Sequence, residues 1–157
     1  MSKGLFVGSF DPFTIGHASV VRRVLPLFDQ LVIGVGINPA KQPQQSAEER
    51  VAAIRKLFAE EPRVEVRSYS GLTVDLAQAC GAAYLVKGVR SVKDFEYERE
   101  QADINRQLTG IETILLPAEP GMESVSSSLV RQLQQLGRDV SAFLPTTVNH
   151  NEPQSIR

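Results

Sequence analysis

Cysteine is almost absent from this chain of 157 residues, in which Cys80 is the one residue of that type. A single thiol allows no intrachain disulfide and no cysteine-rich zinc cage. Histidine is nearly as scarce, since the chain has 2, His17 and His150. We therefore expect no metal held by a histidine- or cysteine-rich site. Cys80 is expected to be a small core residue, and His150 is expected to have no role.

An excess of charge of one sign is also missing, because 17 Lys and Arg residues face 18 Asp and Glu residues. A protein that binds nucleic-acid backbone normally has a basic excess, so we expect no nucleic-acid partner. No apolar run approaches the roughly 18 residues of a membrane span, and the N-terminal run is too short for a secretory signal. We expect a soluble, cytoplasmic protein with no membrane partner.

Three familiar enzyme motifs are missing as well. The chain has no G-x-x-x-x-G-K-[ST] sequence, which argues against a P-loop, and no G-x-S-x-G elbow of an α/β-hydrolase. The glycines Gly34 and Gly36 are followed by Pro39, so they do not fit the G-x-G-x-x-G dinucleotide pattern. Neither of the two nucleotide-binding loops is therefore predicted, and an α/β-hydrolase is not predicted either.

Short apolar runs alternate with segments of helical period along the chain. The runs predict strands near residues 3–7, 31–37, 64–66, 84–86 and 113–116. Helices are predicted after Gly16, from Ser46, around Val74, from about Val92 to Leu108, and around Leu129. Such alternation favours right-handed βαβ units. The predicted fold is α/β: a single-domain, Rossmann-like, doubly wound sheet of five parallel strands with helices on both faces.

Several residues predict where individual helices begin and end. Pro26 lies inside the first helical pattern and should end that helix near Leu25. Ser46 with Glu49 three residues later forms a capping box, in which each side chain binds an otherwise unpaired backbone amide. Gly81, Gly110 and Gly137 stand where the later helices should stop.

Polar and charged residues follow each predicted strand. Ligands of open parallel sheets bind outside the carboxyl ends of the strands, so these residues should share one rim. They are the turn at residues 8–12 with His17, then Lys41, then residues 70–73, then residues 87–90, and finally residues 126–128. Helix N-termini bind anions, and Lys or Arg supplies positive charge. The rim is therefore predicted to bind several phosphate groups at once.

The sequence G-S-F-D-P-F-T-I-G-H at residues 8–17 resembles the G-[TS]-F-D-P-x-T-x-G-H signature of the bacterial phosphopantetheine adenylyltransferase family. This family belongs to the nucleotidyltransferase superfamily, whose hallmark is [HT]-x-G-H. The resemblance continues through Lys41 and through the blocks at residues 48–50, 87–90, 94–98, 105–106, 126–130 and 143–145. It spans nearly the whole chain, with the blocks in the family's order and spacing.

The resemblance implies transfer of the adenylyl group of ATP to 4′-phosphopantetheine, which gives 3′-dephospho-coenzyme A and pyrophosphate. It implies His17, Lys41 and Arg90 as catalytic residues. It assigns phosphopantetheine binding to Ser9, Lys41, Thr73 and Lys87. It assigns ATP binding to Ser9, Phe10, His17, Gly88, Val89, Arg90, Glu98, Met122, Glu123, Ser124, Val125, Ser126, Ser127 and Ser128. It also implies Mg²⁺ that arrives with ATP, no metal site on the protein, and a homohexamer.

Two positions depart from the usual pattern of the family. Lys87 stands where members usually have Arg; it keeps the charge and loses the two-pronged guanidinium. Ser9 stands where many members have Thr, which keeps the hydroxyl. From these blocks we predict a nucleotidyltransferase domain at residues 1–145 and a flexible tail at residues 146–157.

Other readings of the same residues remain open. His17 and the serines at 126–128 could serve only as helix caps. Another superfamily member, such as a nicotinamide mononucleotide adenylyltransferase or a cytidylyltransferase, usually has His at position 14 or a different serine-rich closing motif. A nucleotide sensor without catalysis is the alternative of another class. The presence of His17, Lys41 and Arg90 argues against a sensor.

Overall fold

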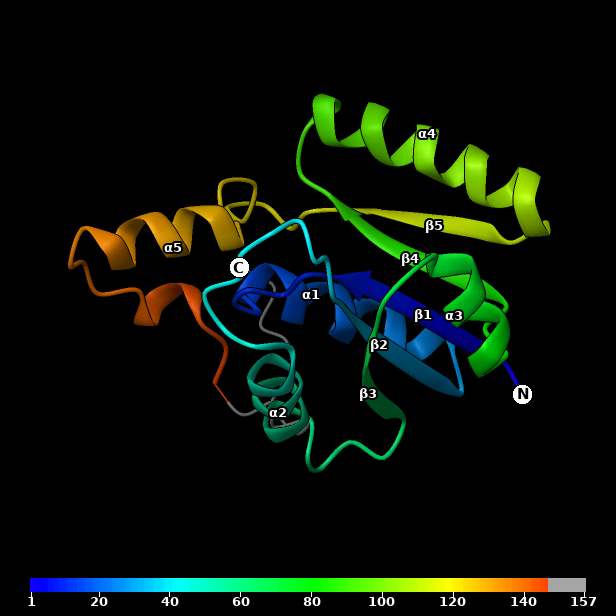
Figure 1. The fold of residues 1–157 in the computed structure, drawn as a ribbon, viewed down its shortest axis with the longest axis horizontal. Coiled ribbons are helices and arrows are strands. Elements are labelled where there is room, and N and C mark those ends of the chain that lie inside the picture. Colours follow the sequence, from blue (N-terminus) through cyan, green and yellow to red (C-terminus); the bar gives the residue numbers. More distant parts are fainter. Residues whose placement is uncertain (147–157) are drawn as a thin grey trace.

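A computed structural model describes residues 1–146, in which the core is a parallel β-sheet (Figure 1). Its strands are β1 (Lys3–Gly8), β2 (Gln30–Gly36), β3 (Val64–Tyr69), β4 (Tyr84–Val89) and β5 (Glu112–Pro117). The strand order is β3-β2-β1-β4-β5, and each neighbouring pair is parallel. The predicted doubly wound sheet of five parallel strands is confirmed.

Helices cover both faces of this sheet. They are α1 (Ile15–Val24), α2 (Ala47–Leu57), α3 (Thr73–Cys80) and α4 (Val92–Thr109). Helix α5 (Ser127–Gln135) extends away from the sheet (Figure 1), and the short 3₁₀ helices are η1 (Leu25–Leu27) and η2 (Ser141–Phe143). Strand residues such as Phe6 and Ile33 pack in one core cluster with residues of α1 and α2. Their neighbours Leu5 and Val32 pack on the opposite face with residues of α3, among them Cys80. This alternation follows from the two-residue period of strands.

The helix ends follow the local signals of the sequence. Helix α1 stops at Val24, and Pro26 lies inside the η1 turn that follows. The Ser46 hydroxyl accepts a hydrogen bond from the Glu49 amide, and the Glu49 side chain accepts one from the Ser46 amide. Gly81 and Gly110 cap α3 and α4 in left-handed conformations, with φ of 74° and 78°. These predictions are confirmed.

Strand β4 is longer than its apolar run predicts. The sequence places residues 87–90 in a loop after the strand, whereas in the structure Lys87, Gly88 and Val89 belong to β4. These three residues pair with residues 115–117 of β5, and this partner was not visible in the local pattern. Arg90 is therefore the first residue beyond the strand.

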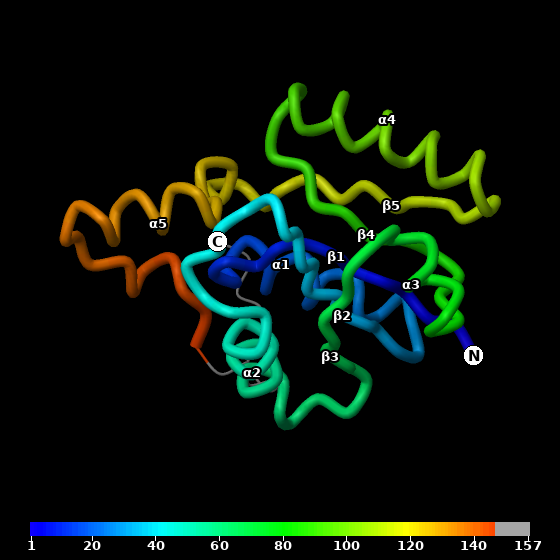
Figure 2. Tube along the Cα trace, in the orientation of Figure 1, coloured from blue at the N-terminus to red at the C-terminus, as the bar shows by residue number. Residues whose placement is uncertain are grey.

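The strand order creates a switch point beside β1. From β1 the chain moves outward through β2 to β3, then returns past β1 and places β4 on its other side (Figure 2). The connections therefore diverge at the carboxyl ends of β1 and β4. In open α/β sheets this divergence opens a crevice in which ligands bind.

Helix α4 is the least buried of the α-helices in the described residues. It lies along β4 and β5 (Figure 1), yet it contains no buried residue. Apolar side chains on it are exposed, among them Val92, Phe95, Ile104 and Leu108. No helix within residues 1–146 has the length and apolar character that crossing a membrane requires. Residues 147–157, with His150, lie outside the described residues, so the flexible tail stays a prediction.

Candidate active site

The turn after β1 brings His17 to the switch point. Phe10 adopts a φ of 49°, in the left-handed region that non-glycine residues rarely use, and this bends the chain sharply after Ser9. Thr14 is the N-cap of α1, and its hydroxyl accepts a hydrogen bond from the His17 amide. The His17 ring reaches back to the Thr14 amide, so the two residues form a capping box.

This capping box determines which ring nitrogen of His17 carries the proton. The Thr14 amide N–H donates to His17 Nδ1 over 2.9 Å. Because an amide N–H can only donate, Nδ1 must be the acceptor, and the neutral ring carries its proton on Nε2. His17 thus offers one fixed N–H donor.

The surroundings of the ring keep it neutral. The Phe10 and Phe13 rings pack against it, with centroids 4.9 Å and 5.2 Å from its own. Burial of the ring, together with the positive charges of Arg90 and Lys87, lowers the pKa of His17 from 6.5 to about 4. At neutral pH His17 is therefore an uncharged donor and has no proton to give up as a general acid.

A cavity of about 350 Å³, which we call the α1 cavity, opens beside this ring. Two helix N-termini point at it, those of α1 and α5. It contains nearly all of the predicted ATP-binding residues: Ser9, Phe10, His17, Gly88, Val89, Arg90, Glu98, Met122, Val125, Ser126, Ser127 and Ser128. Glu123 and Ser124 do not contribute to its wall, and the Glu123 carboxylate instead accepts from the Gly121 amide at 2.9 Å.

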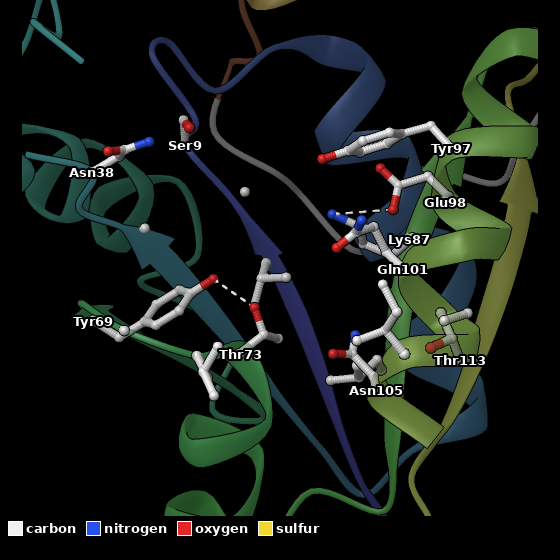
Figure 3. Close-up of a pocket in the computed structure, with 18 of the residues that line it drawn as sticks. Ser9, Asn38, Tyr69, Thr73, Lys87, Tyr97, Glu98, Gln101, Asn105 and Thr113 are labelled. Carbon is white, nitrogen blue, oxygen red and sulfur yellow. Dashed lines mark hydrogen bonds and ion pairs between the residues drawn. The ribbon is translucent and has the colours of Figure 1, made fainter. Parts of the chain in front are cut away.

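A second cavity of about 540 Å³, the α4 cavity, lies between α3 and α4 (Figure 3). Tyr97, Glu98, Gln101 and Asn105 of α4 form one side, and Thr73 lies on the other. The predicted phosphopantetheine-binding residues all line it: Ser9, Lys41, Thr73 and Lys87. The Thr73 hydroxyl lies 3.1 Å from the Tyr69 hydroxyl.

The two cavities meet at a shared wall. The residues that line both are Val7, Gly8, Ser9, Lys41, Lys87 and Glu98. This wall contains two cations and the free end of β1. Two ligands, one in each cavity, would therefore touch each other at Ser9, Lys41 and Lys87.

Carboxylates hold two of the site's cations in place. Lys87 Nζ lies 3.5 Å from Glu98 Oε2, and Arg90 Nε donates to Asp94 Oδ2 at 3.1 Å. The Glu98 oxygen has no hydrogen-bonding partner among the described residues although it is buried. The pair at Lys87 is thus loosely matched, and an anionic ligand could compete with Glu98 for the ammonium group.

The three serines at the start of α5 have separate partners. Ser126 is the N-cap, and its hydroxyl accepts from the Leu129 amide. Ser127 donates its hydroxyl proton to the Pro12 carbonyl at 2.7 Å, which ties α5 to the turn after β1. The capping role that the sequence left open is therefore real for Ser126, and all three serines also line the α1 cavity.

Sequence reasoning missed two features of the wall of the α1 cavity. Arg131 lines the α1 cavity and donates to the Asp11 carbonyl at 2.7 Å and to the Ser128 hydroxyl at 3.2 Å. Its place one helical turn after Ser128 was a usable signal. Gly88 leaves room for α1, because a Cβ there would lie 3.1 Å from Val20 Cγ2. The family resemblance had assigned Gly88 to ATP binding only.

Carboxylates around the α1 cavity are already paired. Glu98 faces Lys87, Asp94 binds Arg90, and Glu119 accepts from the Ser19 hydroxyl and from Arg22. Within residues 1–146 no group of three His, Cys, Asp or Glu side chains is arranged to hold a metal ion.

The switch-point crevice, the helix N-termini and the paired cavities define a nucleotide-binding α/β protein. The sequence matches the cytidylyltransferase-like family over residues 5–133. In three dimensions, a crystal structure from Vibrio parahaemolyticus, named provisionally as a nicotinate-nucleotide adenylyltransferase, superposes with a TM-score of 0.67 at 21% identity. The match covers 94% of this chain and 89% of that one, and it concerns the fold alone.

Closer sequence relatives give the particular family. A protein of Phocaeicola vulgatus named phosphopantetheine adenylyltransferase is 55% identical over 145 residues, 92% of this chain and 96% of that protein. A protein of the same name from Bacteroides fragilis is 52% identical over 92% of this chain and 97% of its own length. The chain belongs to the phosphopantetheine adenylyltransferase family.

The protonation of His17 gives a first prediction. The pKa of about 4 in the folded protein lies below the value near 6.5 of an unfolded chain. The unfolded state therefore binds a proton first as the pH falls. We expect the stabilising contribution of neutral His17 to be complete above about pH 6.5 and to be lost as the pH falls towards 4. ¹⁵N NMR of the imidazole should show the Nε2–H form throughout pH 5–8.

The control variant is His17→Gln, since Gln at this helix position completes a capping box but does not titrate. Between pH 7 and 4.5 the parent protein should lose more unfolding free energy than His17→Gln does. An imidazole that titrates near 6.5, or that carries its proton on Nδ1, would contradict the geometry described above.

Proposed function

We propose that this protein transfers the adenylyl group of ATP to 4′-phosphopantetheine and releases pyrophosphate, a step of coenzyme A biosynthesis. The observation that carries the proposal is the pair of adjoining cavities with one cationic wall at the β1/β4 switch point. Membership of the phosphopantetheine adenylyltransferase family supports the identity of both substrates.

The reaction asks little covalent chemistry of the protein. The phosphate of phosphopantetheine is already an anion near neutral pH, so it can attack the α-phosphorus of ATP without a general base. What the protein must supply is alignment of the two phosphates and compensation of the charge that develops on the transferring group. A neutral His17 fits this requirement, because no step needs it to accept or release a proton.

In this mechanism each substrate occupies one cavity. ATP lies in the α1 cavity, with its phosphates near the N-termini of α1 and α5, where free amides and helix dipoles favour anions. Phosphopantetheine lies in the α4 cavity and presents its phosphate at the shared wall. Ser9, Lys41 and Lys87 belong to both cavities, so they contact the point where the new P–O bond forms.

The proposed catalytic roles follow from charge and geometry. His17 donates its Nε2–H to an α-phosphate oxygen, and its Nδ1 bond to Thr14 keeps the ring oriented for this. Lys41 and Arg90 offset the negative charge that develops as pyrophosphate leaves. Arg90 is held for this task by Asp94 and by the Val125 carbonyl, at 3.1 Å and 3.4 Å.

Magnesium enters this scheme as part of the substrate, bound to the triphosphate. The paired state of Glu98, Asp94 and Glu119 fits that arrangement, because Mg²⁺ commonly keeps several waters and takes phosphate oxygens as ligands. The cation would neutralise charge on the leaving pyrophosphate.

We expect pyrophosphate release from ATP to depend on the acceptor. The assay compares 4′-phosphopantetheine with nicotinamide mononucleotide at equal concentrations, in the presence of Mg²⁺. Turnover with phosphopantetheine alone supports the proposal. Turnover with nicotinamide mononucleotide would favour another adenylyltransferase activity, and ATP binding without turnover on either acceptor would favour a nucleotide sensor.

His17 and Lys87 should affect different kinetic constants. An N–H that binds the α-phosphate mainly in the transition state acts on kcat, and losing one such donor typically costs about 10²–10³-fold. His17→Ala should therefore lower kcat by at least about 100-fold and keep ATP affinity within several-fold. Lys87→Ala should raise the KM for phosphopantetheine about 10-fold or more, the usual effect of losing a charged hydrogen bond.

Two conservative variants separate chemistry from folding. His17→Gln keeps the helix cap, so it should recover the stability that His17→Ala loses and should not recover kcat. Lys87→Arg keeps the charge and should keep a low KM. An unchanged kcat in His17→Ala would reduce His17 to a cap, and an unchanged KM in Lys87→Ala would show that this position binds no phosphate.

We also propose that the protein assembles as a homohexamer. Helix α4 has no buried residue in the single chain, and Val92, Phe95 and Leu108 on it are exposed, so further chains could cover this surface. Closed symmetric assemblies are the usual way to do so. Light scattering at micromolar concentration should report about six chain masses. A fully active monomer would contradict this.

Residues 1–145 form the nucleotidyltransferase domain in this proposal, with the two cavities lined by residues between Phe6 and Arg131. ATP and phosphopantetheine are its partners in the cytoplasm. The net charge of −1 gives no support for a nucleic-acid partner.

A further inference from the structure

Lys41 belongs to an exposed loop, and its position needs an explanation. The loop, residues 37–45, connects β2 to α2 and is exposed except for the half-buried Gln45. The Lys41 amide donates to the Asn38 carbonyl at 3.1 Å, which closes a turn within the loop. That turn alone does not fix the loop relative to Ser9, the first residue after β1, yet Lys41 and Ser9 line the same cavities.

Arg50 connects this loop to the end of β1. It lies in α2 with 3% of its surface exposed. Its Nη1 donates to the Ser9 carbonyl at 2.6 Å and to the Gly36 carbonyl at 3.1 Å. Its Nε donates to the Gln45 carbonyl at 3.2 Å. One guanidinium group thus binds the residue before the loop, the last residue of the loop, and Ser9.

Asp11 makes a second connection from the turn after β1. It is 6% exposed, and its two carboxylate oxygens accept from the amides of Gln44 and Gln45 at 2.9 Å and 3.1 Å. Its own carbonyl accepts from Arg131 at 2.7 Å. The loop is therefore attached at its end to the same turn that presents Ser9 and leads to His17.

A third cavity of about 300 Å³ lies between these groups. It is lined by Ser9, Asp11, Gly36, Asn38, Lys41, Gln42, Pro43, Arg50 and Arg131. Arg50 has no ion pair with a carboxylate among the described residues. A buried charge without a carboxylate is costly unless it is well hydrogen-bonded, so the carbonyl contacts of Arg50 are needed to keep it in place.

We propose that Arg50 and Asp11 are positioning residues that hold the loop at residues 37–45 against Ser9, so that Lys41 reaches the transferring phosphate. The inference rests on the proposed function, because it needs Lys41 to act on the reaction. Neither residue lines the α1 cavity or the α4 cavity, so both act through the groups that they bind.

Arg55 provides a matched control on the same helix. Its Nε and Nη2 donate to the Val66 carbonyl at 3.2 Å and 2.9 Å. Like Arg50, it joins α2 to a strand carbonyl, but its partner is in the middle of β3 and it lines none of the three cavities. Arg50 is buried and Arg55 is exposed, so their effects on stability can differ, but a role limited to stability would leave kcat per folded molecule unchanged in both.

The first test compares Arg50→Lys with Arg55→Lys in the acceptor assay, alongside thermal unfolding. Lysine keeps the charge but cannot make the same set of bonds. We expect Arg50→Lys to lower kcat about 10- to 100-fold, the effect of a displaced catalytic group. Arg55→Lys should keep kcat within about 2-fold even where its loss of Tm is similar. Equal kcat values for the two folded variants would overturn the proposal.

The second test asks whether Asp11 acts through Lys41. Asp11→Asn replaces one acceptor oxygen by an NH₂ group. An NH₂ group only donates, so the Asn side chain cannot give each of the Gln44 and Gln45 amides its own acceptor oxygen. Asp11→Asn should lower kcat about 10-fold in the parent. In a Lys41→Ala background it should lower kcat less than about 3-fold, because the side chain that Asp11 positions is already absent. Hydrogen exchange at Gln44 and Gln45 should become faster.

The outcomes separate this inference from the proposed function. A parent protein without turnover on ATP and phosphopantetheine contradicts the function itself. An active parent in which Asp11→Asn has its full effect in the Lys41→Ala background contradicts the positioning role. If Arg50→Lys fails to fold, Asp11→Asn decides the matter, and failure of both to fold assigns them to stability and overturns the proposal.

Discussion

The bond from the Thr14 amide to His17 Nδ1 is the constraint on which the site depends. It starts α1 directly after the turn that follows β1, and in doing so it orients the ring. It also leaves Nε2 as the nitrogen with a proton, while the packed phenylalanine rings hold the pKa of His17 near 4. One local contact therefore sets the helix start, the ring orientation and the proton's position. A histidine that merely faced the cavity would have none of these fixed.

The sheet topology determines what can meet this histidine. The chain returns past β1 to form β4. Lys87 and Arg90, which lie 70 and 73 residues after His17 in the sequence, therefore reach the same rim. Cations gathered in this way repel one another. The structure limits the repulsion by giving Lys87 and Arg90 the carboxylates Glu98 and Asp94, whereas Lys41 is left on an exposed loop. Under the proposed function, an anionic substrate replaces part of the pairing of Lys87 and Arg90 with these carboxylates. The carboxylates thus limit the repulsion between the cations that the reaction requires.

Sequence reasoning succeeded where the determining interactions are local. Apolar runs and capping residues predicted every strand and helix of the sheet, and most of the residues assigned from the family motifs line one of the two cavities. It was wrong about residues 87–89, because their pairing with β5 depends on a strand about 28 residues later. It missed Arg50 for the same reason, since the Ser9 carbonyl is 41 residues away in sequence. Glu123 was assigned to ATP binding with the segment at residues 122–128, yet it lies outside the wall of the α1 cavity, because membership of a segment does not specify where each side chain points.

The sequence left open whether His17 and the serines at 126–128 are caps or functional groups; the structure shows caps at His17 and Ser126, and under the proposed function these residues also contact phosphate. A helix N-terminus binds an anion only if its first amides are fixed in place and some are left free. The Thr14–His17 box and the Ser126 hydroxyl satisfy one part of each set of amides, and the Ser127 bond to Pro12 joins the two helix starts. Capping is therefore compatible with the phosphate binding that we propose. Because the same atoms serve both purposes, any substitution that removes a cap also disturbs the site, and only replacements that keep the cap can show what the side chain adds to the chemistry.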